Sequence, residues 1–160
     1  MIRRNFIKIA GAASAAALLG VPARADEVLL TITGNVTDGA RAFTDADLLA
    51  LPQISFETST IWTDGVLRFS GPSVASVLEA AGAGPGDITF AAVNDYVVSM
   101  PRNVVEAGAP IIANRIGGEP FSRRDKGPLW IVFPYDSDAR FRAESLYAYS
   151  VWQLVGLTVG

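Results

Sequence analysis

The sequence contains no cysteine and no histidine. Without a thiol or an imidazole, the chain cannot build a Ser-His-Asp or Cys-His nucleophile system, an imidazole general base, a thiolate metal ligand or a disulfide. Its chemistry is left to carboxylates, hydroxyls, aromatic rings, Arg, Lys and the backbone. These groups bind polar ligands well, but a redox or hydrolytic centre made from them needs a cofactor that supplies the reaction.

The chain also lacks a hydrophobic run long enough for a good membrane span. Its first 25 residues instead predict an export signal, with paired arginines, a mildly hydrophobic Ala/Gly-rich run and a small-x-small cleavage site at Ala23-x-Ala25. The pattern resembles a twin-arginine signal, and Arg24 and the low hydrophobicity both favour that route. An ordinary Sec signal or an uncleaved anchor is the alternative. We expect a periplasmic mature chain that begins at Asp26.

Positive charge is scarce. The chain has 13 Lys and Arg against 16 Asp and Glu, and four of the cations lie in residues 1–25, so the mature chain carries 9 cations and a net charge of −7. This balance argues against nonspecific binding to nucleic acid or to an anionic membrane. Five of the remaining cations cluster within 25 residues: Arg102, Arg115, Arg123, Arg124 and Lys126. The cluster fits either an anionic ligand or partner, or a solvated loop with local salt bridges.

Residues 26–160 contain no repeat, low-complexity tract or obvious linker and predict one domain. Thr44 with Asp47 predicts the start of a short helix, and a second helix is expected at 73–81. Alternating or continuous apolar runs predict strands at 28–34, 54–58, 66–69, 88–93, 96–100, 111–116, 129–133 and 151–159. The fold class expected is therefore a mixed α+β domain with a mainly β core.

The first candidate binding segment follows the second predicted strand. The hydroxyls of Thr58, Ser59 and Thr60 stand close to Trp62. Loops held on a rigid sheet are where binding groups concentrate. A core tryptophan with surface threonines is the competing interpretation, and the segment alone does not decide between them.

A second candidate is the polar turn formed by Asn94, Asp95 and Tyr96 between two apolar strands. Asn-Asp is ordinary turn chemistry and needs no ligand.

The third candidate is a run of four charges before a Gly-Pro pair and an apolar strand. Arg123, Arg124 and Lys126 can present donors to a carbonyl or a phosphate.

Taken together, these segments resemble the molybdopterin-binding domain of sulfite-oxidase-type oxidoreductases. The resemblance covers nearly the whole mature chain and rests on the order and spacing of four segments, at 69–78, 94–101, 110–120 and 126–134. It implies the compact, mainly β sulfite-oxidase-type molybdopterin-binding fold with short helices.

Two features depart from that family. Its members hold molybdenum through one cysteine in the loop equivalent to Thr58–Thr60, where this chain has hydroxyls, which are far weaker ligands for such a centre. The lysine-rich loop that grips the cofactor phosphate is replaced by residues 136–142, with two aspartates, although Arg140 and Arg142 remain as contacts for a phosphate or tail. The chain resembles the short, cysteine-free branch that binds pterins in the periplasm and is thought to feed a membrane signalling partner.

The leading hypothesis is therefore a periplasmic pterin-binding protein that acts as a non-catalytic ligand sensor. The alternative is a molybdopterin-dependent oxidoreductase or a subunit of one, which the twin-arginine signal favours. A subunit that keeps the fold only for interaction is a third reading. The missing cysteine and histidine favour the sensor.

A pterin is flat and needs a stacking partner, for which we expect Trp62. Asp95 is the expected acceptor for the ring N–H and amine, and Arg123 and Lys126 are the expected donors. Trp130 and Trp152 are expected to serve stability rather than ligand binding. The full expected ligand-binding set is Thr58, Ser59, Thr60, Trp62, Asn94, Asp95, Tyr96, Arg123, Lys126 and Gly127.

The missing thiolate leads to a prediction about metal content. Purified mature protein should carry far less than one molybdenum per chain, because no side chain matches the soft ligand that such a centre needs. Elemental mass spectrometry measures this directly. Stoichiometric molybdenum together with sulfite- or sulfoxide-linked turnover would establish the enzyme instead.

Overall fold

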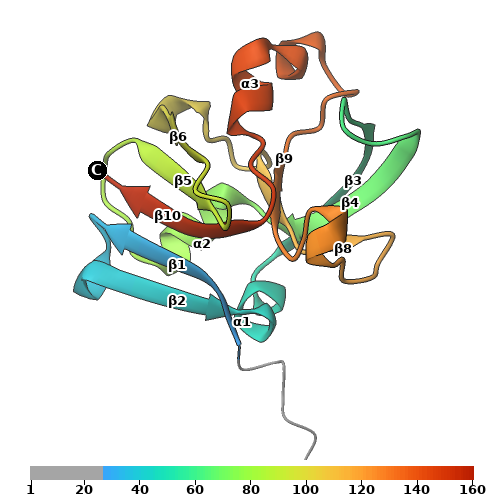
Figure 1. Cartoon of the computed structure of the whole chain (residues 1–160). Helices are drawn as coiled ribbons and strands as arrows, with labels where there is room; N and C mark the ends of the chain where they lie inside the picture. Colours follow the sequence, from blue (N-terminus) through green and yellow to red (C-terminus); the bar gives the residue numbers. More distant parts are fainter. Residues whose placement is uncertain (1–26) are drawn as a thin grey trace, which may run out of the picture.

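The computed structural model describes residues 27–160, so the predicted signal and its cleavage site lie outside the described residues. The largest sheet has five strands in the order β2 (Ala40–Thr44), β1 (Val28–Gly34), β10 (Leu154–Val159), β5 (Ile88–Ala92) and β6 (Val97–Met100). Strands β1 and β10 run parallel, and the other pairs are antiparallel. Figure 1 shows this sheet on the left of the molecule.

The part of the molecule beside the five-stranded sheet is built on a hairpin. Strand β3 (Gln53–Ser59) pairs with β4 (Val66–Pro72), and β4 also pairs with the short β8 (Arg115–Ile116). Strands β7 (Ile111–Ala113) and β9 (Trp130–Val132) form a separate buried pair. The β3–β4 hairpin extends to the right in Figure 1 and carries the Trp62 loop.

Three short α-helices connect these strands within the described chain: α1 (Asp45–Ala50), α2 (Val74–Ala80) and α3 (Glu144–Tyr149). Short 3-10 turns lie at η2 (Thr37–Gly39), η3 (Arg102–Val104), η4 (Arg123–Asp125) and η5 (Ala139–Arg142). Within residues 27–160, no helix has the length and apolar character needed to cross a membrane.

The predicted helix starts are confirmed. The Thr44 hydroxyl accepts from the Asp47 backbone N–H at 3.2 Å, and the Asp47 carboxylate accepts from the Thr44 N–H at 2.9 Å. This reciprocal pair is a capping box, which satisfies donors that a helix start otherwise leaves unpaired. The Ser73 hydroxyl likewise accepts from the Ser76 N–H at 3.0 Å and begins α2.

The mixed α+β class with a mainly β core is confirmed, with differences in detail. Strand β2 and helix α3 were not expected from the sequence. The strand expected at 111–116 is divided into β7 and β8 at Asn114, which bonds to β4 through its N–H. The last strand begins at Leu154 instead of residue 151, because Gln153 adopts a left-handed backbone with φ 51°.

Gly71 of β4 generates a prediction about packing. A Cβ at Gly71 would lie 2.0 Å from the Ile112 carbonyl oxygen of β7, so Gly71→Ala forces two strands apart. Overpacking of this kind costs about 1–3 kcal/mol or more, and Tm should fall by several degrees. Gly108→Ala is the control, since no atom lies within 4 Å of its Cβ position. Equal Tm values for the two variants in thermal unfolding would contradict the packing seen here.

Candidate functional site

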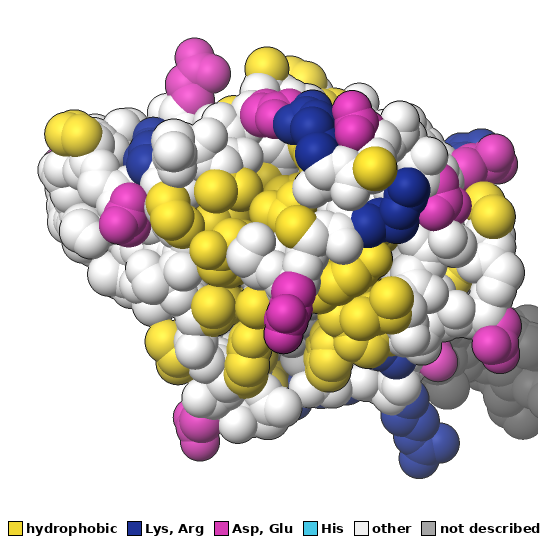
Figure 2. All heavy atoms as spheres, turned by 90° about the horizontal axis from the view of Figure 1, so that it is seen from above, with side chains coloured by type: hydrophobic (Ala, Val, Ile, Leu, Met, Phe, Trp, Pro, Cys, Tyr) yellow, Lys and Arg dark blue, Asp and Glu magenta, His cyan; other side chains and the backbone are white. Residues whose placement is uncertain are grey.

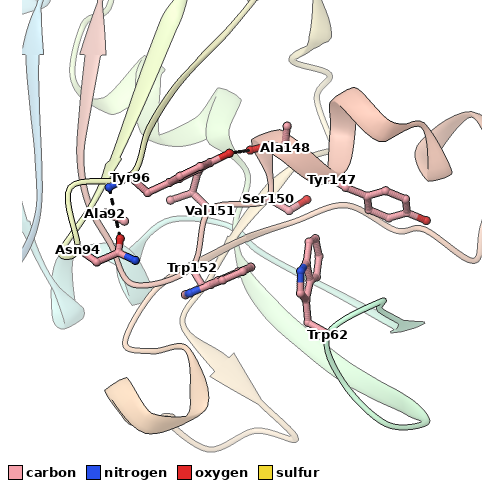
Figure 3. A pocket seen from close by; sticks show the side chains of 9 residues that line it. All are labelled: Trp62, Ala92, Asn94, Tyr96, Tyr147, Ala148, Ser150, Val151 and Trp152. Atoms are coloured by element: carbon pink, nitrogen blue, oxygen red, sulfur yellow. Dashed lines mark hydrogen bonds between the residues drawn. The ribbon is translucent and has the colours of Figure 1, made fainter.

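A cleft of about 260 Å³ lies where three distant parts of the chain meet. The loop after β3 supplies Trp62, the β5–β6 turn supplies Asn94 and Tyr96, and the α3–β10 segment supplies the rest of the wall. Figure 3 shows these side chains converging from the hairpin, the turn and the end of α3. The lining residues are Trp62, Ala92, Asn94, Tyr96, Tyr147, Ala148, Ser150, Val151 and Trp152.

Aromatic rings fix the shape of this cleft. The Trp62 ring makes edge-to-face contacts with Trp152, Tyr147 and Trp130, with ring centroids 5.5, 5.8 and 5.9 Å apart. Such arrangements are the preferred geometry of aromatic pairs and add stability beyond burial. Trp62 is therefore half-buried and held in place, with one side turned to the cleft.

The polar groups of the cleft are few and uncharged. The Asn94 Oδ1 accepts from the Tyr96 N–H at 3.3 Å, and the Tyr96 hydroxyl donates to the Ala148 carbonyl at 3.0 Å, which ties the turn to α3. Ser150 is buried and donates to the Leu146 carbonyl at 2.7 Å. None of the nine lining residues carries a charge. A flat, neutral ligand with polar atoms at its edge suits such a wall.

Tyr135 supports the cleft from behind. Its hydroxyl is hydrogen-bonded to the Ser150 hydroxyl, and burial raises the pKa of Tyr135 to about 12. The phenol therefore stays neutral at physiological pH and keeps its hydrogen bond to a lining residue.

The hydroxyls of Thr58 and Ser59 at the end of β3, and of Thr60 just after it, serve the scaffold and lie outside the cleft wall. The buried Thr58 hydroxyl accepts from the Asp136 N–H at 3.1 Å. The Ser59 N–H and hydroxyl donate to the Asp136 carboxylate at 2.6 and 2.7 Å. The Thr60 hydroxyl accepts from the Trp62 N–H at 3.1 Å and also bonds to Thr63. These groups shape the Trp62 loop rather than face a ligand in this cleft.

Asp95 lies at the exposed tip of the β5–β6 turn, with φ 64°, between two residues that line the cleft. It is not itself part of the wall. The polar group that this turn does present to the cleft is Asn94.

The charged run after residue 122 also lies apart from the cleft. Arg123 borders a separate cavity of about 450 Å³ together with Asn114 and Arg115. The Lys126 ammonium sits against aromatic faces, 5.8 Å from the Trp152 ring centre and 5.9 Å from that of Trp130. Gly127 packs so closely that a Cβ would lie 2.0 Å from the Phe121 carbonyl oxygen. Lys126 therefore packs against the aromatic cluster outside the cleft, and Arg123 lines a separate cavity.

The two arginines expected to meet a phosphate or tail already have protein partners. Arg140 forms ion pairs with Glu106 and, at 3.6 Å, with Asp138. Arg142 donates to the Tyr135 carbonyl at 2.9 Å.

Trp152, which was expected to serve stability, lines the cleft, whereas Trp130 is fully buried. Tyr147 and Ser150 also line the cleft and were not identified from the sequence. The signal available was the dense aromatic spacing of Tyr147, Tyr149 and Trp152 just before the last strand. That density marks a cluster but does not tell a ligand wall from a core.

The residues present do not fit a molybdenum centre. The chain has no thiolate, and the Thr58 oxygen at the equivalent loop is buried and hydrogen-bonded to Asp136. Over residues 27–160, no group of three or more Asp or Glu side chains is placed to hold a metal ion.

No protein-family model matches the chain, and no curated protein matches it. Among solved structures, it is similar to the sulfane dehydrogenase SoxCD from Paracoccus pantotrophus, with a TM-score of 0.62 and 21% sequence identity. The match covers 86% of this chain and 39% of the SoxCD chain, so this protein spans about two fifths of that chain's length. At this identity the similarity concerns the fold. It supports the sulfite-oxidase-type α+β fold expected from the sequence.

The hydrogen bonds between Ser59 and the Asp136 carboxylate lead to a prediction about how stability depends on pH. Hydrogen bonds from the Ser59 N–H and hydroxyl lower the pKa of Asp136. A carboxylate whose pKa is lowered by folding stabilises the protein above its unfolded pKa of about 4, and this contribution is lost as pH falls through the folded value. In Asp136→Asn, Tm should therefore fall less than in the parent between about pH 5 and about pH 3. Asp64→Asn, at an exposed aspartate of the same hairpin, is the control and should follow the parent.

Proposed function

We propose that this protein binds a pterin in the aromatic cleft and acts as a periplasmic ligand-binding protein without catalysis. One observation carries the proposal: four of the nine lining residues are aromatic and none is charged. A pterin is a flat, neutral ring system, so its faces match Trp62 and Trp152.

The polar edge of the ligand has a natural partner in this cleft. A pterin edge carries a carbonyl, a ring N–H and an exocyclic amine. A carboxamide both donates and accepts, so Asn94 is complementary to such an edge. In this proposal Asn94 takes the role that the sequence suggested for Asp95, whose side chain lies outside the wall.

The rest of the chain favours binding over chemistry. It offers neither thiol nor imidazole, and Thr58, Arg140 and Arg142, which the resemblance placed near a cofactor, are bonded within the protein. We infer export to the periplasm from the first 25 residues, by the twin-arginine route.

A role as a sensor is part of the proposal. Apolar side chains flank the cleft on two hairpins: Ile61 is 63% exposed, Val97 is 59% exposed and Val93 is 41% exposed. Figure 2 shows hydrophobic side chains gathered in the middle of one face, with charged groups mostly around its edge. Exposed apolar patches of this kind favour protein contacts. The partner proposed is the periplasmic domain of a membrane signalling protein.

A second candidate is a subunit of a molybdopterin-dependent oxidoreductase. The similarity to a sulfane dehydrogenase favours it. It would require a cofactor retained without a thiolate from this chain.

One experiment separates the two candidates. Protein purified from the periplasm is denatured, the released small molecules are examined for pterin fluorescence, and molybdenum is measured in the same sample. A released pterin without molybdenum supports the binding protein. Molybdenum with an attached pterin supports the oxidoreductase. If the sample releases neither pterin nor molybdenum, and the protein does not bind added pterins, both proposals are overturned.

Trp62 generates a prediction about affinity. Trp62→Ala should weaken pterin binding by about 1–3 kcal/mol, the range of aromatic stacking on a base, which is roughly one to two decades in Kd. Titration calorimetry measures the change. Phe56→Ala is the control, because Phe56 is a half-buried aromatic of the same hairpin that does not line the cleft. Unchanged affinity in folded Trp62→Ala would place the ligand elsewhere.

A further inference from the structure

Gln153 occupies an unusual backbone conformation directly beside the cleft. It follows the lining residue Trp152 and has φ 51°, in the left-handed region that residues with a Cβ rarely adopt. Such a conformation persists only where neighbouring contacts impose it.

Three hydrogen bonds impose it here. The Gln153 N–H donates to the Lys126 carbonyl at 3.0 Å, and the Gln153 carbonyl accepts from the Val93 N–H at 3.0 Å. The side-chain Nε2 donates to the Arg123 carbonyl at 2.8 Å. One residue therefore joins the η4 turn to the β5–β6 turn, which belong to different parts of the fold.

Each of the two turns that Gln153 joins contributes a residue that lines the cleft or contacts one that does. The η4 turn ends at Lys126, whose ammonium lies over the Trp152 ring, 5.8 Å from its centre. The β5–β6 turn begins at Val93 and presents Asn94. The aromatic wall and the amide of the cleft are thus fixed relative to each other through Gln153.

We propose that Gln153 is a positioning residue that sets the geometry of the ligand cleft by fixing the positions of Trp152 and Asn94 relative to each other. The inference rests on the proposed function, because its readout is pterin affinity. It predicts that loss of the Gln153 amide loosens the cleft more than it destabilises the fold.

The chain offers a matched control, because it contains only two glutamines. Gln53 also donates through Nε2 to backbone carbonyls, those of Leu48 and Leu51, both at 2.8 Å. It is the first residue of β3, shortly after α1, and does not line the cleft. The variants Gln153→Met and Gln53→Met therefore remove the same kind of donor at two different sites, with side chains of similar length.

The test measures Kd for neopterin and tetrahydrobiopterin by quenching of tryptophan fluorescence, alongside Tm. Gln153→Met should raise Kd about five- to tenfold, the scale of one lost hydrogen bond. Gln53→Met should lower Tm at least as much and leave Kd within about twofold of the parent, since it lies outside the cleft.

A second variant separates positioning from stability. Gln153→Gly relieves the left-handed strain but keeps no side-chain donor, so Tm should hold or rise while Kd increases. Parent-like Kd in both Gln153 variants overturns the inference and leaves the proposed function standing. A parent protein that binds neither probe overturns the proposed function, and the inference with it.

Discussion

Packing around the Trp130 ring is the interaction on which the rest of the structure depends. The ring is fully buried on β9 and contacts Phe69 of β4 edge to face, with centroids 5.4 Å apart. Its Nε1 donates to the Ser150 carbonyl at 3.2 Å, and its ring contacts both Trp62 and Trp152. Core and cleft therefore share one aromatic cluster, and a change in either alters the other.

Several polar side chains form ion pairs with each other or hydrogen bonds to the backbone. Arg115 holds Asp45 with two nitrogens, at 2.7 and 2.9 Å, and Asp136 holds the loop that leads to Trp62. Loops without disulfides need such local bonds to keep a defined shape. Arg115 of the charged cluster therefore already has a protein partner.

Local structure followed from the sequence more directly than the cleft did, although the sequence named three of its nine lining residues, Trp62, Asn94 and Tyr96. The capping pair Thr44 and Asp47 acts over three residues, so its geometry follows from the sequence. The cleft instead joins Trp62, Asn94 and Trp152, whose proximity depends on the packing of separate sheets. The direction of Asp95 depends on a left-handed turn, and residue type alone gives no such direction.

The position of β10 in the five-stranded sheet has a consequence for folding. It lies between β1 and β5, so before β10 docks, the sheet consists of two separate antiparallel pairs, β2–β1 and β5–β6. The pairing of β1 with β10 joins residues more than a hundred positions apart, such as Thr31 and Gly156. Closing so long a loop is slow compared with forming a hairpin. The facing edges of β1 and β5 therefore stay unpaired until β10 docks between them.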